Sequence, residues 1–275
     1  MSSLFKLVFA LLLCANAFAV ETNKLVLRIA ADPNNLPFSN DRLEGFENRI
    51  ADLIAKELGA EVQYNWRAQR RGFFRETLKA NEADLVMGVP ADFERAAPTK
   101  PYYTSSYVFV TRKNRGFNFR NLDDPRLRTL RIGVQVIGDD YANTPPAHAL
   151  GTRGIITNVF GYTLYGNYAE PNPPSQIISA VEREEIDVAL VWGPLAGYFA
   201  SKAKTRLEVR PIEPTAEDSD LVFSIAIGCR RKDPELRKKV DAILAKHRSD
   251  VDAILAEYHL PQVEAPPNRA RRGDD

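Results

Sequence analysis

The sequence is poor in the residues that build disulfides, metal sites and nucleophiles, with two cysteines and three histidines among 275 residues. Cys14 lies in an N-terminal apolar run, so Cys229 is left alone in the rest of the chain and cannot form an intrachain disulfide. The residues before it, 225–228, have the pattern of a strand, which favours a buried and unreactive thiol.

Sequence motifs of the common enzyme classes are also absent. The chain contains no H-E-x-x-H, G-x-S-x-G, Walker or G-x-G-x-x-G pattern. Its two acidic pairs, Asp123 with Asp124 and Asp139 with Asp140, lack the ligand spacing of a calcium loop. We therefore expect a binding protein rather than an enzyme, with no metal and no cofactor.

Long apolar runs are confined to the N-terminus. Lys6 precedes the apolar run 7–15, which is too short to span a bilayer, and residues 17–19 (A-F-A) have the form of a signal peptidase site. These features predict a signal peptide over 1–19, cleavage after Ala19 and export to a bacterial periplasm. No second apolar segment approaches the roughly 20 residues of a transmembrane helix.

Neither sign of charge dominates. Without the signal peptide and its Lys6, 37 − 1 = 36 basic residues stand against 36 acidic ones over 275 − 19 = 256 residues. A net charge near zero gives no general attraction to nucleic acid or to an anionic membrane. A chain of this length is long enough for two lobes, each with a core of its own.

The sequence does contain a repeated helix–Asp–strand unit. The stretch E-A-D-L-V-M-G-V-P carries Asp84 and then a buried strand candidate, 85–89. The stretch E-I-D-V-A-L-V-W-G-P carries Asp187 and a second candidate, 188–191. Two such units, about a hundred residues apart, predict two similar lobes whose strands end at a shared cleft.

Strand and helix patterns alternate along the chain. Strand patterns occupy 25–31, 61–66, 84–89, 103–111, 129–134, 187–191 and 221–229. Helical patterns occupy 45–59, 71–81, 173–184, 194–202 and 234–247. The order predicts an α/β fold with mainly parallel sheets. We predict lobe 1 over 20–113 and 209–262, lobe 2 over 114–208, and a disordered tail over 263–275.

Two segments, G-F-E-N-R-I-A-D-L-I-A-K-E-L-G from Gly45 and the stretch 82–103, resemble the family 3 periplasmic solute-binding proteins of ABC transporters. The resemblance covers nearly all of the mature chain and implies the two-lobed type II binding-protein fold with two hinge strands. R-R-G-F-F-R-E-T-L, G-V-Q-V-I-G-D-D-Y and D-V-A-L-V-W-G-P-L-A-G-Y are similar to the quinoprotein dehydrogenase-associated branch, the MxaJ/XoxJ-type proteins. That branch accompanies PQQ-dependent methanol dehydrogenases in methylotrophs.

The resemblance also implies residues of a ligand-binding cleft. Arg95 matches the arginine with which amino-acid-binding members hold the ligand carboxylate, a task that suits its two parallel charge-assisted bonds. A structural pairing with a neighbouring acid is the alternative role for this arginine. Gly88, Phe38 and Tyr102 are further cleft candidates, and aromatic core packing explains either ring equally well.

Lobe 2 departs from the amino-acid binders. They usually place an acidic residue just after the strand that corresponds to 187–191, where it pairs with the ligand's ammonium, but this chain has Trp192 and Gly193 there. Asp139 and Asp140 are candidate substitutes from the neighbouring loop, or an ordinary helix start. The acidic residue that recognises the ammonium group of an amino acid is therefore missing at its usual position. We expect no tight binding of common amino acids, and a small anion is an alternative ligand.

Two segments are candidates for docking a partner protein. The first follows the second strand and supplies Trp66, Arg67, Arg70 and Arg71. The second lies in lobe 2 and supplies Tyr162, Tyr165 and Tyr168. Arginine, tyrosine and tryptophan dominate protein interfaces. The alternatives are a solvated basic face for the first segment and a buried strand pair for the second.

Three functions are compatible with these patterns. The first is an accessory factor that binds and matures a periplasmic PQQ methanol dehydrogenase, with its cytochrome c system, whether that enzyme uses calcium or a lanthanide. The second is a transport receptor for a small polar or anionic solute, and the third is an enzyme on the same fold, as in cyclohexadienyl dehydratases. An accessory protein without a ligand favours an open cleft, because closure requires a ligand that prefers the closed form.

Overall fold

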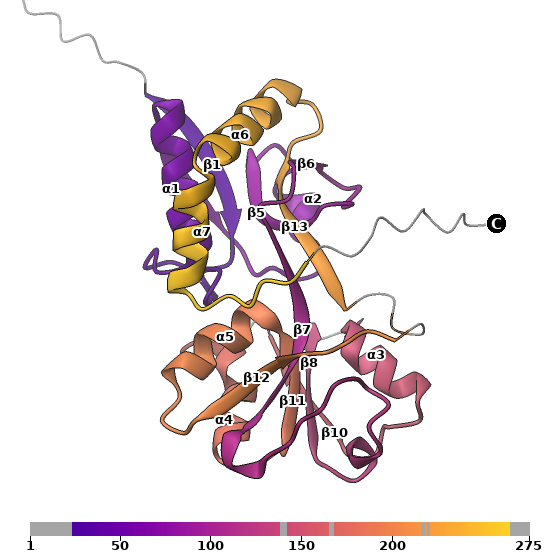
Figure 1. Ribbon diagram of the computed structural model, residues 1–275. Helices are drawn as coiled ribbons and strands as arrows, with labels where there is room; N and C mark the ends of the chain where they lie inside the picture. The colour runs from indigo at the N-terminus through magenta and orange to yellow at the C-terminus, as the bar shows by residue number, and fades with distance from the viewer. Residues whose placement is uncertain (1–23, 138–141, 165–167, 216–217, 219–220, 265–275) are drawn as a thin grey trace, which may run out of the picture.

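The strand and helix patterns fold into two lobes that long strands connect (Figure 1). The computed structural model describes residues 24–137, 142–164, 168–215, 218 and 221–264. The predicted signal peptide, 1–19, lies outside these described residues. Within them, no helix is long and apolar enough to cross a membrane.

The sheet of lobe 1 is parallel at its centre. Strand β1 (Leu25–Ala31) pairs in parallel with β4 (Ala60–Trp66) and with β5 (Leu85–Pro90). Helix α1 (Phe46–Leu58) makes the crossover from β1 to β4, and it ends at Gly59, whose φ of 65° suits the left-handed conformation of a helix terminus. The predicted β-α-β order is thus confirmed for this lobe.

Helices cover both faces of the lobe 1 sheet. Helices α1, α6 (Pro234–Lys246) and α7 (Arg248–Glu257) lie together on one face, and the short α2 (Phe73–Glu76) lies on the other (Figure 1). The Asp233 carboxylate accepts a hydrogen bond from the backbone N–H of Leu236, so it caps α6.

Lobe 2 repeats this plan. Strand β8 (Ile132–Ile137) pairs in parallel with β10 (Val159–Thr163) and β11 (Val188–Trp192). One face of this sheet packs against α4 (Gln176–Glu182) and α5 (Gly193–Lys202). The other face packs against α3 (Pro145–Thr152) and against Phe119, which precedes β8 in the chain.

The remaining elements of the two lobes are short. They are β2 (Asn34–Asn35), β3 (Ser39–Asn40), β6 (Ala97–Pro98), β9 (Ala142–Asn143), and the 3-10 turns Lys113–Arg115, Pro125–Arg128 and Pro173–Ser175.

One strand belongs to both lobes. In β7 (Tyr103–Arg112), the first residues pair antiparallel with β13 (Val222–Cys229), and residues 107–112 pair with β11 and with β12 (Leu207–Pro211). Strand β13 then pairs with β5 in lobe 1. The chain therefore crosses between the lobes within β7 and returns before β13. Residues 107–112 and 209–211, which we assigned to lobe 1, lie in the lobe 2 sheet.

Two predicted helices are shorter than their patterns. The pattern 71–81 forms a helix only at α2, where the Thr77 hydroxyl donates to the Phe73 carbonyl and the chain turns away. The pattern 173–184 begins as a 3-10 turn over its two prolines before α4 starts at Gln176. Val263, the first residue of the predicted disordered tail, donates its backbone N–H to the Thr104 carbonyl on β7, and residues 265–275 lie outside the described residues.

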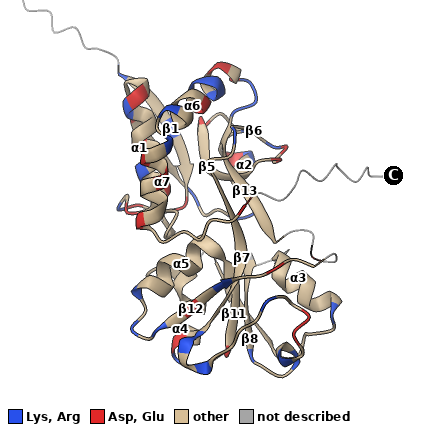
Figure 2. Ribbon diagram, in the orientation of Figure 1, with Lys and Arg blue, Asp and Glu red and all other residues tan. Residues whose placement is uncertain are grey.

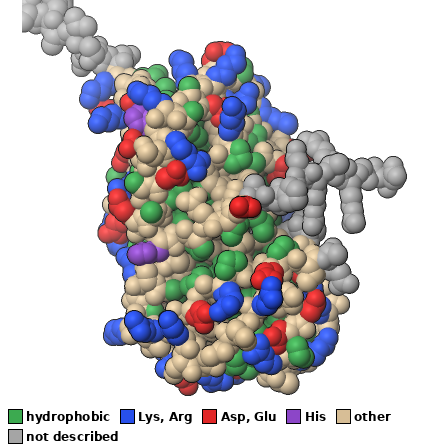
Figure 3. All heavy atoms as spheres, viewed as in Figure 1, with side chains coloured by type: hydrophobic (Ala, Val, Ile, Leu, Met, Phe, Trp, Pro, Cys, Tyr) green, Lys and Arg blue, Asp and Glu red, His purple; other side chains and the backbone are tan. Residues whose placement is uncertain are grey.

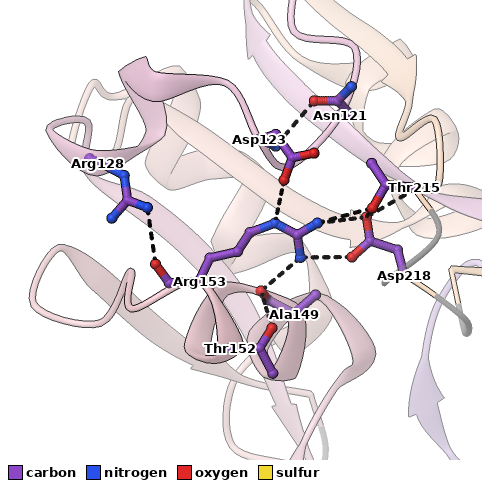
Figure 4. Close-up of polar contacts among 8 residues, drawn as sticks. All are labelled: Asn121, Asp123, Arg128, Ala149, Thr152, Arg153, Thr215 and Asp218. Carbon is purple, nitrogen blue, oxygen red and sulfur yellow. Dashed lines mark hydrogen bonds and ion pairs between the residues drawn. The ribbon is translucent and has the colours of Figure 1, made fainter.

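A buried ion pair fixes the outer face of lobe 2 (Figure 4). Arg153, which ends α3, donates to both carboxylate oxygens of Asp218, at 2.8 and 3.1 Å, and to the carbonyl of Ala149. The Asp218 side chain is fully buried and that of Arg153 is 8% exposed. A third partner, Asp123, accepts from Nε at 2.8 Å on the solvent side. Arg153 thus ties α3 to two loops.

The mixture of surface charges and the burial of the Cys229 thiol both agree with what the sequence predicts. Lys and Arg are interspersed with Asp and Glu over both lobes (Figure 2). Hydrophobic side chains lie along the boundary between the lobes on the face shown in Figure 3. Cys229 is buried at the end of β13, as predicted, and burial raises the pKa of its thiol to about 12.

Candidate functional site at the lobe interface

A small cavity lies between the two lobes, where strands of both sheets end. Its volume is about 130 Å³, and its wall consists of Asn35, Phe38, Glu47, Gln69, Gly88, Tyr103, Trp192 and Ile225. Trp192, the last residue of β11, is the contribution of lobe 2. The loop after β1, the start of α1, the loop after β4 and β5 supply most of the rest. Ligands of open α/β sheets bind at such carboxyl ends of strands.

Among the described residues of the cavity wall, Glu47 is the one carboxylic acid. It is in the first turn of α1 and is 8% exposed. Its carboxyl group makes no hydrogen bond or ion pair with any residue that the structure describes. Burial raises the pKa of this carboxyl to about 8, so the free protein holds Glu47 largely protonated at neutral pH.

Gly88 lets the Glu47 side chain reach the cavity. A Cβ atom added to Gly88 would lie 2.5 Å from Oε1 of Glu47, which is closer than real Cβ contacts. A larger residue at this position on β5 would displace the carboxyl group from its present place. Gly88 thus provides space for the carboxyl group, and its own backbone conformation is that of an ordinary strand.

Aromatic rings of both lobes surround the carboxyl group. Tyr103 packs edge-on against Phe46, and Phe38 lies 5.4 Å from the same ring. Trp192 contacts Tyr107 and Phe223 of the two long strands, at 5.3 and 5.9 Å between ring centroids. The Trp192 backbone N–H donates to the side-chain oxygen of the buried Gln135 on β8. The cavity wall is thus rigid on its aromatic side.

Asp32, Arg70 and Tyr168 lie next to the wall residue Gln69, in a region that we call the entrance of the cavity. The buried carboxylate of Asp32 accepts from the backbone N–H groups of Asn34 at 2.9 Å and of Gln69 at 2.8 Å, so it holds together the loops that follow β1 and β4. From lobe 2, the Tyr168 hydroxyl lies 3.5 Å from the same carboxylate. Burial raises the pKa of Asp32, and these donors oppose the shift.

The two lobes also touch each other beside the cavity. The Asn34 amide donates to the Glu170 carbonyl at 2.9 Å and accepts from the Asn172 backbone N–H at 3.2 Å. Tyr198 of α5 stacks on Tyr258, which follows α7, with 5.6 Å between centroids. Asn172, Tyr198 and Tyr258 line one surface pocket, so these contacts belong to one region of the interface. The lobes are thus in contact, which differs from the open cleft that we associate with an accessory protein without a ligand.

A family model described as bacterial extracellular solute-binding proteins, family 3, matches residues 27–261. The chain belongs to this family. The family model describes extracellular solute-binding proteins, and solved structures of periplasmic binding proteins share the fold seen here. The predicted fold class, an α/β type II binding-protein fold with two hinge strands, is therefore confirmed.

Relatives within the family confirm the branch to which the sequence is similar. Protein MoxJ of Methylorubrum extorquens is 29% identical over 259 residues, which cover 89% of this chain and 84% of MoxJ. The crystal structure of periplasmic binding protein XoxJ from Methylobacterium extorquens AM1 is 32% identical, with a TM-score of 0.70, over 87% of this chain and 100% of XoxJ. The crystal structure of MxaJ from Methlophaga aminisulfidivorans MPT is 25% identical, with a TM-score of 0.72, over 86% of this chain and 100% of MxaJ.

The structure brings three of the predicted cleft residues of this binding protein together. Phe38, Gly88 and Trp192 all line the cavity. Gly193 lies beside it, at the start of α5, against the side chain of Ser105 on β7. Asp139 and Asp140 lie outside the described residues.

Two other predicted cleft residues lie elsewhere. Tyr102 is 2% exposed in the core of lobe 1, where its hydroxyl donates to the Met87 carbonyl at 3.0 Å. Arg95 is exposed and is absent from the cavity wall. Its loop is anchored on the α2 side of the sheet, where Phe93 packs against Phe74 at 4.5 Å. The position expected to hold a ligand carboxylate thus contributes nothing to this cavity.

The two predicted docking segments meet at the cavity entrance. Arg70 follows Gln69, and its charge acts on both Asp32 and Tyr168. The other members of these segments differ in their surroundings. In the first segment, Trp66 stacks on Tyr64 at the edge of the lobe 1 core, Arg67 forms an ion pair with Glu76, and Arg71 is exposed. In the second segment, Tyr162 is half-buried on β10, and Tyr165 lies outside the described residues.

Sequence reasoning missed the polar half of the site. Glu47, Asn35 and Gln69 line the cavity, and Asp32 shapes its entrance, but we singled out none of them. The available signal was the acidic residue in G-F-E at the start of α1. An acid in the first helical turn usually complements the helix dipole at the surface, so the pattern alone does not indicate a buried carboxyl.

Proposed function

We propose that this protein acts in the periplasm as an accessory factor of a PQQ-dependent methanol dehydrogenase, which it binds and helps to mature or activate. The observation that carries the proposal is the similarity to MoxJ, XoxJ and MxaJ over both lobes. The quinoprotein dehydrogenase-associated branch, which the sequence resembles, implies such an enzyme and its cytochrome c as partners.

The entrance of the cavity is the docking surface that we infer. It joins a cationic segment of lobe 1, with Arg70 and Arg71, to Tyr168 of lobe 2, which is 47% exposed. Because the mature chain has almost no net charge, long-range steering is weak and local patches must supply recognition. An acidic patch on the dehydrogenase, or on its immature form, would complement this surface.

Charge reversal at the entrance tests the docking surface. In the double variant Arg70→Glu with Arg71→Glu, we expect weaker co-purification with the dehydrogenase and lower dehydrogenase activity in cells. The matched control is Lys79→Glu with Lys232→Glu, because it makes the same change of net charge at two exposed positions of lobe 1. Circular dichroism and thermal melting establish that both double variants are folded.

Two results would count against the proposal. Equal co-purification and activity for a folded entrance variant and its control would remove the entrance from the mechanism. Normal maturation of the dehydrogenase in cells that lack the whole protein would remove the accessory function itself.

The contacts between the lobes favour a second function, that of a transport receptor for a small solute. Receptors of this kind close over their ligand, and the lobes here are in contact beside the cavity. Solute-dependent stimulation of a permease and its ATPase, with no effect on the dehydrogenase, would establish this function in place of the first.

A further inference from the structure

The interlobe cavity has the composition of a cation site. The described residues of its wall include one carboxylic acid, Glu47, together with two carboxamides and three aromatic rings. No lysine, arginine or histidine is among the described residues that line it. An anion would therefore meet a carboxyl group and aromatic rings without any positive partner, at a large desolvation cost.

Glu47 is more buried than its place in α1 requires. An acid in the first turn of a helix complements the helix dipole equally well from an exposed position. Here the side chain instead points at Gly88, is 92% buried (8% exposed), and finds no donor among the described residues. A buried polar group without a partner is costly, so its presence indicates a group that arrives from outside.

We propose that the cavity binds a small organic ammonium cation, with Glu47 as its counter-ion and Phe38, Tyr103 and Trp192 as its aromatic walls. Cations are attracted to aromatic faces, and proteins recognise alkylated ammonium groups with such aromatic cages. The carboxamides of Asn35 and Gln69 offer oxygen acceptors to any N–H donors that the ligand carries.

The volume sets the size of the ligand. An engineered apolar cavity of about 150 Å³ holds benzene, which has six non-hydrogen atoms. The present cavity, about 130 Å³, is slightly smaller. This volume matches an ammonium ion with about one to four carbon atoms.

The ligand would also hold the lobes together. Phe38, Glu47 and Tyr103 are contributed by lobe 1, and Trp192 by lobe 2. A cation between them contacts both lobes only when the cleft is closed, so it stabilises the closed form. The closed arrangement seen here is the one in which such a site is complete.

Calorimetry with simple ammonium ions tests the site. The probes are methylammonium and tetramethylammonium chloride, compared with tert-butanol, which is neutral and of similar size, and with acetate and glycine. We expect at least one ammonium ion to bind with a Kd below 1 mM, and no binding of the other three. Glycine carries an ammonium group but adds a carboxylate for which the cavity has no cationic partner.

The variant Glu47→Gln keeps the shape of the side chain and removes its charge. We expect it to weaken binding of the ammonium ion by about thirtyfold or more, the usual effect of removing one partner of a buried charge pair. Glu61→Gln, which removes the same charge at an exposed position of β4, is expected to bind like the unaltered protein. Thermal melting with and without the probe shows whether Glu47→Gln is folded.

A proton readout distinguishes a counter-ion from a merely structural acid. Tetramethylammonium has no titratable group, and the titratable groups that face Glu47 are Tyr64, Tyr102 and Tyr103, whose pKa values are all raised. Binding at pH 6–7 should therefore release up to one proton from Glu47, measured as a dependence of the binding heat on the buffer. The affinity should rise as the pH approaches 8.

The proposal is overturned if neither ammonium ion binds, if acetate or tert-butanol binds as tightly, or if Glu47→Gln binds the cation like Glu61→Gln. The cation site is independent of the docking surface at the cavity entrance. Its test uses the isolated protein, so failure of cation binding and failure of dehydrogenase docking are separate results.

Discussion

Glu47 is a single residue whose protonation couples to folding. Burial raises the pKa of its carboxyl from 4.5 to about 8 in the folded protein, while the unfolded chain keeps the ordinary value. Its proton therefore favours the folded state below pH 4.5. As the pH rises toward 8, the unfolded chain gives up this proton first, and that stabilisation is lost.

We predict that the ligand-free protein loses stability between pH 5 and pH 8, by on the order of 3 kcal/mol through Glu47 alone. Glu47→Gln carries no titratable group and should lack this part of the slope. Urea unfolding of both proteins across this range measures the difference. Parallel pH profiles for the two proteins would show that Glu47 titrates normally in the fold.

At the scale of secondary-structure elements, an equivalent aspartate anchors a pair of parallel strands in each lobe. Asp84, before β5, accepts hydrogen bonds from the backbone N–H and the guanidinium of Arg28, which lies in β1, 56 residues earlier. Asp187, before β11, accepts in the same way from Arg131, also 56 residues earlier. The repeated helix–Asp–strand pattern was thus a direct signal of equivalent units in the two lobes.

The loops of lobe 2 depend instead on a single arginine. Removing one partner of a buried ion pair leaves an uncompensated charge and costs about 3–5 kcal/mol. We predict that Asp218→Ala destabilises lobe 2 by about this amount, because it leaves the guanidinium of Arg153 without its buried counter-ion.

Asp123→Ala is the matched control for that prediction. It removes a partner of the same guanidinium, but one whose side chain is 57% exposed, so its cost should stay below about 1 kcal/mol. Denaturant unfolding, followed by circular dichroism, compares the two variants. Equal costs for both would contradict the distinction between a buried and an exposed partner.

At the scale of the whole molecule, a C-terminal strap restrains the angle between the lobes. The strap, residues 258–263, leaves α7 of lobe 1 and runs along α5 of lobe 2 (Figure 1). The Ser105 hydroxyl on β7 donates to the Pro261 carbonyl at 2.6 Å. A Cβ atom added to Gly197 on α5 would lie 1.9 Å from the His259 carbonyl oxygen, so the strap and α5 are in close contact.

We predict that Gly197→Ala opens the cleft. The added methyl group must push the strap from α5, which separates Tyr258 from Tyr198 and costs about 1–3 kcal/mol as overpacking. Small-angle X-ray scattering should show a larger radius of gyration, and the fluorescence of Trp192 should change as the cavity opens to water.

Gly151→Ala is the control for the strap variant. Gly151 is also in a helix, α3, but nothing lies within 4 Å of an added Cβ atom. Alanine there should leave the cleft closed and stabilise the helix by roughly 0.5–1 kcal/mol. An unchanged radius of gyration in both variants would show that the strap does not control the lobes.

The architecture of this protein could be predicted from local patterns in its sequence. Apolar spacing at strand and helix periods, with Asp84 and Asp187 before two equivalent strands, was sufficient to predict two α/β lobes and a long crossing strand. These signals are local, because a strand or helix is encoded by neighbours within a few residues. The lobe boundaries were less accurate, because β12 joins its sheet by pairing with a distant strand.

The residues that line the cavity, in contrast, became known only from the tertiary structure. Glu47, Gly88 and Trp192 are far apart in the sequence and become a single wall because strands of two sheets end at one place. Whether an acid is exposed at a helix start or buried against a glycine depends on such distant packing, and so does its pKa. For the same reason Arg95, which matches a ligand-binding position in sequence, lies outside the cavity, while Glu47 lies inside it.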